Sequence, residues 1–365
     1  MSKKIRVGIL CGGKSAEHEV SLQSAKSIVE AIDRERYDPV MIAVDKKGEW
    51  HLTDVSKFLL NADNPKLVQL NKVSDNLALA PGKRSGQLIS LVSHGSAAPV
   101  DVVFPVLHGP FGEDGTLQGL MKLANLPFVG PGVLGSAVSM DKDVAKRLLR
   151  DAGLAIARFL VFERSSLNRI DFNKIKDELG VPLFIKPANL GSSVGINKVN
   201  DKEQFEAAVN EAFKYDNKIV IEEFIEGREL HVSVLGNDPP EVLPIIEFDF
   251  SELPPEHPRI ISYDAKWDPL KESFHRVHSV CPAKLSKRLE KKVKAAALAA
   301  YKITGCQDYA RLDIRLTKDN KVFILEVNPN PDLTEGVSFM ESAEKYGLSF
   351  GETLSKIVYC ALNRP

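Results

Sequence analysis

A short apolar run that ends in two glycines constrains the fold of this chain most strongly. Residues 7–11 are long enough for one buried strand, and Gly12-Gly13 then turns the chain into a segment with helical periodicity. Similar runs at 37–44 and 102–107 predict two more strands. Strands separated by helices predict an α/β domain with a parallel, doubly wound sheet, whose ligands lie at the carboxyl ends of the strands.

The pattern changes after about residue 135, where helices and antiparallel strands are expected instead. The expected elements are a helix at 140–152 with Val144, Leu148 and Leu149 on its apolar face, strands at 181–186 and 195–199, an antiparallel pair at 218–223 and 231–235, a helix at 285–304, a hairpin at 309–328 and a C-terminal helix. Residues 251–282 are rich in proline, so we expect mostly loop there, long enough to suggest a function.

Length and composition define the broad class of protein. A chain of 365 residues is expected to form two or three domains. Hydrophobic residues make up 44% and charged residues 27%, which is typical of a globular protein and not of a disordered or fibrous one. The net charge of -1 provides no overall field that would attract nucleic acid or an anionic membrane, so we expect neither as a partner.

The cysteines and the N-terminus favour a cytoplasmic protein. The four cysteines form no C-x-x-C pair and have neither zinc-site nor disulfide-framework spacing, so we expect free thiols in a reducing compartment. The apolar run at 7–11 is shorter than the ~7–15 residues of a signal-peptide core. No stretch approaches the ~18 apolar residues of a membrane span.

The predicted C-terminal hairpin carries the clearest chemistry. Strand alternation puts Arg311, Asp313 and Arg315 on one face of the first strand. It likewise puts Glu326 and Asn328 on one face of the second strand. In the expected register, Asp313 lies opposite Glu326, and Arg311 lies opposite Asn328. Two carboxylates and an amide then converge beside an arginine.

This register follows if Asp319-Asn320 is a two-residue turn, in which case Lys318 faces Lys321. Carboxylates that lie so close repel each other unless a cation intervenes, and oxygen ligands of this kind suit Mg²⁺ held together with substrate phosphates. A solvated charged face is the ordinary alternative, but it fits poorly because Leu325 and Val327 indicate burial. The hairpin therefore predicts a metal site.

Glycine-rich segments provide further candidates. Lys186 ends a predicted strand and precedes a glycine–serine loop that could fold over phosphates, although an ordinary hairpin loop is the alternative. Residues 8–15 match the Walker A spelling, but 9–11 are predicted strand residues and not loop, so we interpret the match as accidental. A P-loop kinase or GTPase that relies on Lys14 is the alternative. Glu17, near the predicted helix start, could hold an ammonium group.

His108 stands at the carboxyl end of a predicted strand, at the start of a loop rich in glycine and charge. A lone histidine is more often a satisfied core residue. Its place at the strand end, where ligands of a parallel sheet bind, favours a role in a substrate site.

Taken in order, these segments resemble the D-alanine–D-alanine ligases of the ATP-grasp superfamily. The matching runs are 12–21, 108–119, 139–142, 186–195, 222–229, 309–313 and 326–328. The resemblance implies an enzyme that uses ATP to join two D-alanines through an acyl phosphate, as a step of peptidoglycan synthesis and cell-wall biogenesis. A ligase for a different amino acid or hydroxy acid, or a nucleotide-binding protein without turnover, is the alternative.

The resemblance also implies a domain organisation. An N-terminal α/β domain at 1–130 would be followed by an ATP-grasp fold of two subdomains, a central one at 131–225 and a C-terminal one at 226–365. The loop at 251–282 would close over the site, and the family suggests a homodimer.

The resemblance assigns roles to individual residues. The implied ATP contacts are Lys142 and Lys186 at the phosphates, Ser193 in the loop over them, and Glu222, Phe224, Ile225 and Glu229 around adenine and ribose. The implied ligands of two Mg²⁺ ions, which Mn²⁺ could replace, are Asp313, Glu326 and Asn328. The implied donor-site residues are Glu17, which would bind the ammonium group, with Val20, His108 and Ser192 near it. Arg311 would stabilise the charge of acyl transfer.

Departures from the family pattern gather in the acceptor half. Asp332 replaces a glycine whose backbone N–H lies near the reacting carbonyl, and Val337-Ser338 stands where the family has a serine–leucine pair. Lys266 and Trp267 belong to a substrate-loop motif in which Trp267 replaces a tyrosine. We expect the reaction class to survive and the acceptor site to be altered, because Asp332 would repel an incoming carboxylate unless Arg315, Lys266 or a metal pairs with it.

Overall fold

The computed structural model describes residues 3–61, 68–71, 75–83, 85–95, 97, 99–191, 194–254, 259–261 and 275–364. Within these ranges, every helix is too short or too polar to span a bilayer. Ser192, Ser193, Lys266 and Trp267, together with most of the predicted substrate loop, lie outside the described residues.

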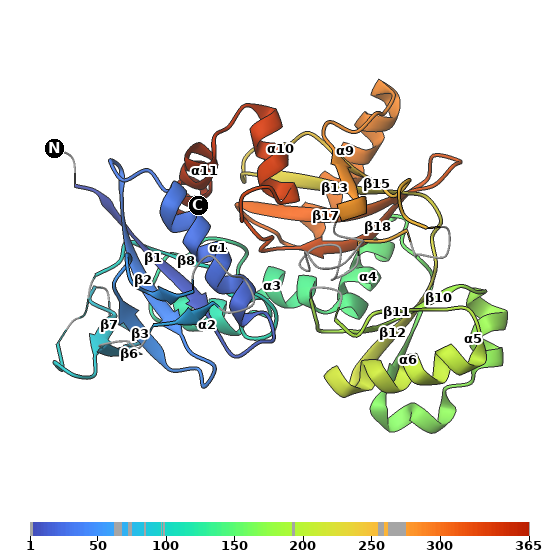
Figure 1. The fold of residues 1–365 in the computed structure, drawn as a ribbon, viewed down its shortest axis with the longest axis horizontal. Helices are drawn as coiled ribbons and strands as arrows, with labels where there is room; N and C mark the ends of the chain where they lie inside the picture. The colour runs from blue at the N-terminus through green and yellow to red at the C-terminus, as the bar shows by residue number, and fades with distance from the viewer. Residues whose placement is uncertain are drawn as a thin grey trace.

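The first sheet has the strand order β7-β6-β3-β2-β1-β8 (Figure 1). Its centre is parallel, because β1 (Ile5–Gly12) pairs in parallel with β2 (Tyr37–Val44) and with β8 (Val102–Pro105). This confirms the predicted parallel core. Antiparallel strands extend the sheet at one edge, and they are β3 (Trp50–Thr53), β6 (Asp75–Leu79) and β7 (Leu88–Ser90). A separate pair consists of β4 (Leu59–Leu60) and β5 (Gln69–Leu70).

Helices cover both faces of the first sheet, because β1 is apolar on both of its faces. Val7 and Ile9 pack with α1 (His18–Ala31), whereas Leu10 packs with α2 (Thr116–Leu123) on the opposite face. The turn from β1 into α1 needs glycine, since Gly12 has a φ of +92° and a Cβ there would lie 2.2 Å from the carbonyl oxygen of Val44.

The second sheet is antiparallel and has the order β11-β10-β12-β9. Its strands are β9 (Phe159–Glu163), β10 (Leu183–Pro187), β11 (Asn197–Val199) and β12 (Lys218–Glu223). The helices of this part are η1 (Arg164–Arg169), α5 (Phe172–Leu179) and α6 (Lys202–Tyr215), the last two of which share a hydrophobic core with the sheet.

The third sheet has the order β16-β15-β13-β17-β18, with β14 paired to β13. Its strands are β13 (Arg228–Leu235), β14 (Glu241–Val242), β15 (Ile246–Asp249), β16 (His278–Val280), β17 (Tyr309–Leu316) and β18 (Val322–Asn328). α9 (Lys287–Ile303) packs on its apolar face. β16 falls inside the segment expected to be mostly loop, because its residues pair with β15.

The predicted pairing of 218–223 with 231–235 is wrong. β12 and β13 belong to different sheets, and the chain crosses from one sheet to the other at Glu226-Gly227. A Cβ on Gly227 would lie 2.3 Å from the carbonyl oxygen of Leu316, so only glycine fits at this crossing. The two sheets therefore meet at a hinge, which residues 224–227 form.

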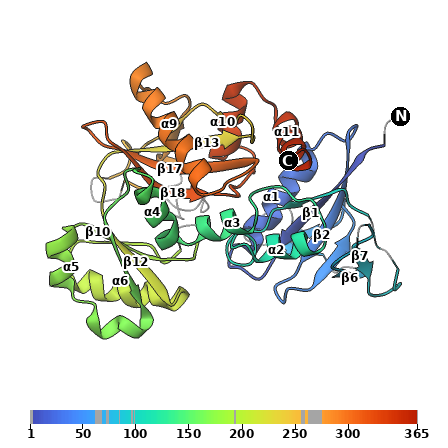
Figure 2. The ribbon, with the colours of Figure 1, turned by 180° about the vertical axis from the view of Figure 1, so that it is seen from behind.

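Two helices connect the first sheet to the others. They are α3 (Val133–Met140) and α4 (Lys142–Asp151), and α3 runs between the first sheet and the rest of the molecule in both views (Figure 1, Figure 2). The predicted apolar face of α4 is wrong in part, because Val144 and Leu148 are exposed while Lys142 and Lys146 are buried. The buried lysines indicate that α4 faces a polar site.

The chain ends against the sheet with which it began. α10 (Ser338–Tyr346) and α11 (Phe350–Leu362) contribute buried apolar residues to the same core cluster as β1 and α1. In both views the C-terminus lies beside the first sheet (Figure 1, Figure 2).

The β17–β18 hairpin has the predicted register at its functional end. Arg311 lies opposite Asn328 and Asp313 lies opposite Glu326. The register shifts after Asp313, because Leu325 is an extra residue between two paired positions of β18.

The predicted two-residue turn at Asp319-Asn320 is wrong. The backbone N–H of Thr317 donates to the carbonyl of Lys321, so Lys318 does not face Lys321 and the loop has one more residue than expected. Asn320 has a φ of +60°, which this longer loop requires. The longer loop moves the register by one residue, and the bulge at Leu325 moves it back.

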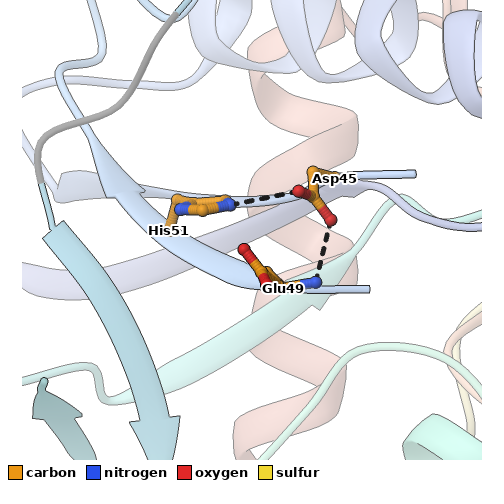
Figure 3. Close-up of side chains that lie close together, drawn as sticks. All are labelled: Asp45, Glu49 and His51. Carbon is orange, nitrogen blue, oxygen red and sulfur yellow. Dashed lines mark hydrogen bonds and ion pairs between the residues drawn. The ribbon is translucent and has the colours of Figure 1, made fainter. Parts of the chain in front are cut away.

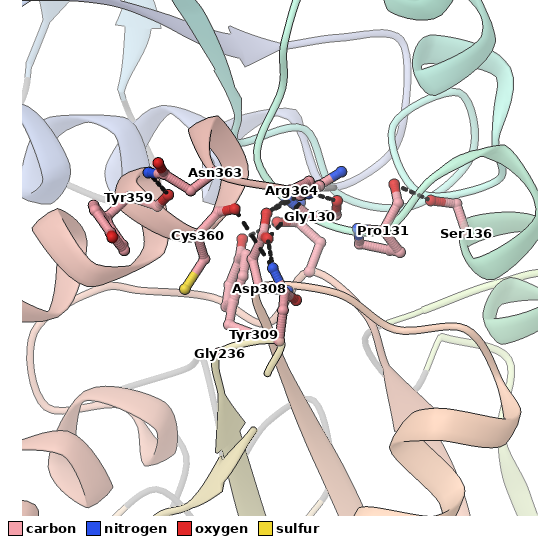
Figure 4. A network of polar contacts seen from close by, with 12 residues as sticks. Gly130, Pro131, Ser136, Gly236, Asp308, Tyr309, Tyr359, Cys360, Asn363 and Arg364 are labelled. Carbon is pink, nitrogen blue, oxygen red and sulfur yellow. Dashed lines mark hydrogen bonds and ion pairs between the residues drawn. The ribbon is translucent and has the colours of Figure 1, made fainter. Parts of the chain in front are cut away.

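A buried carboxylate connects the first sheet, the third sheet and the C-terminus (Figure 4). Asp308, which precedes β17, is fully buried and accepts hydrogen bonds from the backbone N–H of Gly130 at 2.8 Å and from Asn237 Nδ2 at 2.9 Å. It also forms an ion pair with Arg364, which donates to the carbonyl of Gly130. Every partner lies in a different segment, so this network fixes the C-terminus against the first and third sheets.

We predict that Asp308→Ala lowers the free energy of unfolding by about 3–5 kcal/mol, because it leaves Arg364 and Asn237 without their buried acceptor. Denaturant unfolding of the parent and the variant measures this loss. Asp319→Ala, which removes a carboxylate from the exposed hairpin turn, is the control and should change stability by less than about 0.5 kcal/mol. Equal stabilities of Asp308→Ala and the parent would contradict the assignment.

Candidate active site

Three charged side chains meet between α4 and the second sheet. Glu222 of β12 is buried and forms ion pairs with Lys146 of α4, at 2.7 Å, and with Lys186 of β10. Burial alone would raise the pKa of Glu222, but the two ammonium groups lower it to about 2. Burial lowers the pKa of Lys146, Glu222 opposes that shift, and Lys186 adds to it. The carboxylate therefore allows two lysines to share one enclosed place.

Lys142 connects this cluster to the β17–β18 hairpin. It is the first residue of α4 and is buried, with Asp141 as the N-cap. Its Nζ donates to the carbonyl oxygen of Leu190 at 2.5 Å and lies 3.3 Å from Glu326 Oε1. Since Leu190 begins the glycine–serine loop, Lys142 lies where that loop, α4 and the hairpin meet.

One face of the hairpin gathers the predicted metal ligands. Arg311 Nε and Nη2 donate to the two oxygens of Asp313 at 2.7 Å and 3.0 Å. His231 Nε2 of β13 lies 3.5 Å from Asp313 Oδ1. The side-chain nitrogen of Asn328 is buried and makes no hydrogen bond with the residues that the structure describes. Glu326, the neighbour of Asp313 across the strands, completes a set of oxygen donors beside an arginine.

Two glutamates of the first domain approach this hairpin. Glu17, the residue before α1, is buried, and Glu113 lies in the glycine-rich loop after β8. Burial of its carboxyl group and the proximity of Glu17 raise the pKa of Glu113 to about 8. Glu326 adds to this shift, whereas the backbone N–H of Gly109, which donates to Glu113 Oε2 at 2.7 Å, opposes it. These acids are therefore close enough to repel each other.

Glu113 and Lys146 are not among the predicted site residues. For Glu113 the available signal is a pair of acids, Glu113-Asp114, between Gly112 and Gly115 in a strand-end loop. For Lys146 the signal is weaker, because a lysine four residues after Lys142 lies on the same face of α4.

His108 and Glu17 lie together at the start of α1. His108 is buried, and its Nε2 makes no hydrogen bond within the described part of the chain. Its carbonyl oxygen accepts the Ser15 hydroxyl at 2.7 Å, which joins the two strand-end loops. A Cβ on Gly109 would lie 2.4 Å from Glu17 Oε2, so glycine is needed for Glu17 to pack there. Val20 is half-buried, one helical turn after Glu17.

Asp332 has partners of its own. Its Oδ1 accepts the Ser24 hydroxyl of α1 at 2.5 Å and the backbone N–H of Thr334 at 2.9 Å. Its Oδ2 is buried and has no hydrogen bond from the described residues. The expectation that Arg315 could pair with Asp332 is wrong, because Arg315 pairs with Glu229 instead. Asp332 thus links the segment between β18 and α10 to α1.

Of the residues predicted for adenine and ribose, Phe224 and Ile225 lie in the hinge, Glu222 precedes it in β12, and Glu229 follows it in β13. Lys198 Nζ lies 4.5 Å from the centre of the Phe224 ring, and Ile225 beside it is half-buried. Glu229, at the start of β13, is buried and accepts a hydrogen bond from Arg315 Nη2 at 2.5 Å. A cavity of about 550 Å³, lined by residues of both sheets, opens beside this hinge.

Gly191 lies beside Glu17, and Ser338 at the start of α10 contacts His231. A Cβ on Gly191 would lie 3.3 Å from Glu17 Oε2, so the glycine–serine loop approaches the first domain where it enters the segment that is not described. In the acceptor segment, the Ser338 hydroxyl lies 2.8 Å from His231 Nδ1.

The Walker A match does not form a phosphate loop. Residues 8–11 lie within β1, as predicted, and Lys14 is exposed. Its Nζ lies 5.9 Å from the centre of the Phe111 ring and against Gly48, which is unlike the enclosed setting of Lys142 and Lys186. The P-loop interpretation is therefore wrong for this chain.

A second polar group lies at the turn between β2 and β3 (Figure 3). Asp45, Glu49 and His51 bring their ligand atoms within 4.8 Å of one another. Asp45 Oδ1 accepts the backbone N–H of Glu49 at 2.9 Å, and Asp45 Oδ2 lies 3.6 Å from His51 Nε2. These bonds close the turn, which explains the contact without an ion.

The arrangement as a whole suits a polyanion that is held between lysines and acids. Ammonium groups of α4 and β10 lie on one side, and carboxylates of the hairpin lie on the other. Oxygen ligands beside a bound phosphate are those that divalent cations prefer. Glu17 and Arg311 add one group for a cation and one for an anion, so the site can bind an amino acid beside the polyanion.

We predict that Glu222 stabilises the fold above about pH 4.5 and that this contribution is lost as the pH falls toward 2. The sign follows from a folded-state pKa that is lower than the unfolded one, so that protonation favours unfolding. Melting temperatures of the parent and of Glu222→Gln should therefore differ most near neutral pH and converge as the pH falls toward 2. Glu223→Gln is the neighbouring control, and a difference from the parent that is independent of pH for Glu222→Gln would contradict the prediction.

Comparisons with known proteins agree with this geometry. Two family models match the chain, "D-ala D-ala ligase N-terminus" over residues 6–131 and "D-ala D-ala ligase C-terminus" over residues 148–359. A D-alanine–D-alanine ligase of Shouchella clausii is 49% identical over 364 residues, which covers 100% of this chain and 96% of the relative. D-alanine–D-alanine ligase A of Escherichia coli K12 is 45% identical, with 99% and 97% covered.

Solved structures give the same result. VanG D-Ala:D-Ser ligase from Enterococcus faecalis has a TM-score of 0.81 and 32% identity, and the match covers 98% of this chain and 100% of that one. The D-alanine–D-alanine ligase from Coxiella burnetii has a TM-score of 0.81 and 30% identity, with 100% and 95% covered. The family models, the relatives and the arrangement of lysines and acids between two sheets lead to one conclusion: the chain belongs to the D-alanine–D-alanine ligase family and is an ATP-dependent ligase with the ATP-grasp fold.

Proposed function

We propose that this protein joins two D-alanine molecules, with ATP converting the carboxylate of the first into an acyl phosphate, and thereby supplies a precursor of peptidoglycan. The observation that carries the proposal is the meeting of three sheets at one site. The loop that follows β1 of the first sheet supplies Glu17, β10 of the second sheet supplies Lys186, and β17 of the third sheet supplies Arg311. A ligase of this kind must bind an amino acid, a nucleotide and a developing negative charge at one point, and these residues suit those tasks.

The lysines would hold the phosphates of ATP. Lys142 and Lys186 are nearly enclosed, and Glu222 keeps Lys186 in place through their ion pair. A lysine that is held in an enclosed site offsets phosphate charge at little cost in reorganisation. Ser193, in the loop that follows Lys186, would lie over the phosphates. Phe224 and Ile225 at the hinge would receive the adenine.

The hairpin residues fit divalent cations. Asp313 and Glu326 are cross-strand neighbours, and Asn328, whose buried side-chain nitrogen makes no hydrogen bond with described residues, can offer its amide oxygen. These three residues would hold two Mg²⁺ ions, which Mn²⁺ could replace. When bound, such ions offset the charge of the transferred phosphoryl group.

The remaining residues would act on the amino acids. Glu17 would receive the ammonium group of the first D-alanine, with Val20, His108 and Ser192 around it. The carboxylate of this D-alanine would then attack the γ-phosphate of ATP and become the acyl phosphate, and ADP would leave. The neutral amine of the second D-alanine attacks that carbonyl, the C–N bond forms, and phosphate leaves. Arg311 would stabilise the negative charge of the tetrahedral intermediate.

The acceptor half supports a second candidate. Asp332 carries a buried oxygen near Arg311. Burial alone would lower the pKa of the Arg311 guanidinium. The negative charges of Asp313, Glu326 and Asp332 outweigh burial and raise this pKa. An acid in this position would disfavour an acceptor carboxylate. Lys266 and Trp267 would contribute to the same pocket. A D-amino acid or hydroxy acid other than D-alanine is therefore the alternative acceptor.

We further propose that the protein is a cytoplasmic homodimer that binds neither nucleic acid nor a membrane.

Phosphate release from ATP in the presence of single D- and L-amino acids and hydroxy acids tests this function, with mass spectrometry of the products. We expect release that depends on D-alanine, together with D-alanyl-D-alanine. A mixed product with another acceptor would favour the alternative. Release of phosphate with no dipeptide or depsipeptide from any pair would overturn the proposal.

We predict that Glu326→Gln loses at least about 100-fold in kcat while the protein stays folded, because the change removes charge from a cation site without changing its volume. Activity is measured against Mg²⁺ concentration, and circular dichroism checks the fold. Asp319→Asn in the turn of the same hairpin is the control and should retain parental kinetics. An unchanged Mg²⁺ dependence in Glu326→Gln would refute the metal assignment.

We predict that the parent binds the second D-alanine weakly and that Asp332→Gly lowers the KM for this acceptor severalfold, because the substitution removes a negative charge near the incoming carboxylate. The KM for the first D-alanine should not change. Ser24→Ala removes the same hydrogen bond but keeps the carboxylate, so it separates repulsion from loss of the link to α1. Tight acceptor binding in the parent, with no gain in Asp332→Gly, would contradict the prediction.

A further inference from the structure

A single guanidinium group contacts three segments around the hinge. Arg315 of β17 is almost fully buried, with 3% of its side chain exposed. Its Nη1 donates to the carbonyl oxygen of Gly227 at 2.8 Å, and its Nη2 donates to Glu229 Oε2 at 2.5 Å and to the carbonyl oxygen of Arg259 at 2.8 Å. Gly227 belongs to the hinge, Glu229 begins β13, and Arg259 belongs to the segment after β15.

The Glu229–Arg315 pair is fixed from several sides. The two residues are direct cross-strand neighbours in the antiparallel pair of β13 and β17. The Phe224 ring lies over the guanidinium, with its centre 5.8 Å from Arg315 Cζ. Because the guanidinium is planar, its three hydrogen bonds cannot be made independently of one another. A movement of Glu229 is therefore transmitted to Gly227 and to Arg259.

The segment that contains Arg259 is anchored at its other side. Ile261 is buried in a small apolar cluster with Phe250 and Leu253. The backbone of 259–261 is thus held by this cluster and by Arg315. Loss of the hydrogen bond to Arg315 would leave the apolar contact as its described attachment to the third sheet.

We propose that Arg315 is a positioning residue for the nucleotide: it orients Glu229 toward the ribose hydroxyls and couples occupancy of the ribose site to the segment 259–261. The inference rests on the proposed binding of ribose at Glu229. A carboxylate has two oxygens and about four acceptor positions, so Glu229 can receive a hydroxyl while Arg315 holds it. The bound ribose then stiffens Glu229, and the guanidinium passes this constraint to the carbonyl of Arg259.

Arg315→Lys tests the proposal because lysine keeps the charge and loses the planar fork. Arg158→Lys is the matched control. The Arg158 side chain also donates to one glutamate and two carbonyl oxygens, with Nε 2.7 Å from Glu223 Oε2. These partners are Glu223, Glu178 and Leu179, so they differ from the partners of Arg315. Calorimetry gives the affinity of each protein for ATP and for 2′,3′-dideoxy-ATP without D-alanine. Kinetics at saturating D-alanine separate KM from kcat.

The parent and Arg158→Lys should prefer ATP over the dideoxy nucleotide by about 10–100-fold, the range of a hydrogen bond to a charged group. In Arg315→Lys this preference should fall toward unity, mainly through the KM for ATP. Hydrogen exchange in a peptide that contains 259–261 should slow on addition of ATP in the parent and in Arg158→Lys, and should not respond in Arg315→Lys.

A parental preference in folded Arg315→Lys, with exchange that still responds to ATP, would overturn the proposal. If this variant does not fold, Glu229→Gln replaces it, since the amide keeps the volume and weakens the bond to Arg315. It should lose both the preference and the exchange response, and retention of either would overturn the proposal. A parent that binds ATP but forms no D-alanyl dipeptide would refute the proposed function and leave this binding test intact.

Discussion

The crowding of carboxylates around Arg311 is the constraint on which the site depends. Asp313 is bound by Arg311, while burial, together with the nearby Glu17 and Glu326, raises the pKa of Glu113 to about 8. Acids in such proximity repel one another unless cations neutralise them. Lys142, at 3.3 Å from Glu326, is one such cation, and the oxygen donors opposite it are suited to divalent ions. The same crowding requires that the sheets are held firmly together, and Asp308 contributes by binding Gly130, Asn237 and Arg364, which fixes the C-terminus against the first and third sheets.

Local patterns predicted a large part of this structure. The apolar run before Gly12-Gly13 became the central strand of a partly parallel sheet, because a strand that is apolar on both faces must be covered on both. The opposition of Asp313 and Glu326 was predicted from strand alternation and a two-residue turn at Asp319-Asn320, and the premise about the turn was wrong. The loop is one residue longer than expected and the bulge at Leu325 compensates. Neither feature has a strong sequence signal, so their cancellation could not have been foreseen.

Features that depend on distant segments were not predictable in this way. β12 and β13 are neighbours in sequence, and both have strand patterns. They belong to different sheets, because the chain crosses between the sheets at Gly227, which packs against the backbone of Leu316. Lys146 of α4 can be buried because Glu222 of β12 offsets the free-energy cost of enclosing the lysine charge. Asp332 forms a hydrogen bond with Ser24, which lies more than 300 positions earlier in the chain. Arg315 forms its ion pair with Glu229 on the neighbouring strand. The periodicity within each segment does not indicate these partners.

If ATP activates a carboxylate on this scaffold, an oxygen atom of that carboxylate must be transferred to phosphate. D-alanine labelled with ¹⁸O in both carboxylate oxygens is incubated with the protein, Mg²⁺ and unlabelled ATP, and the inorganic phosphate is examined by ³¹P nuclear magnetic resonance. An acyl phosphate requires that one carboxylate oxygen leaves with the phosphate, so the account predicts one ¹⁸O atom in each phosphate released. Phosphate that carries no label, released at the same rate, would show that water attacks ATP and would contradict the account.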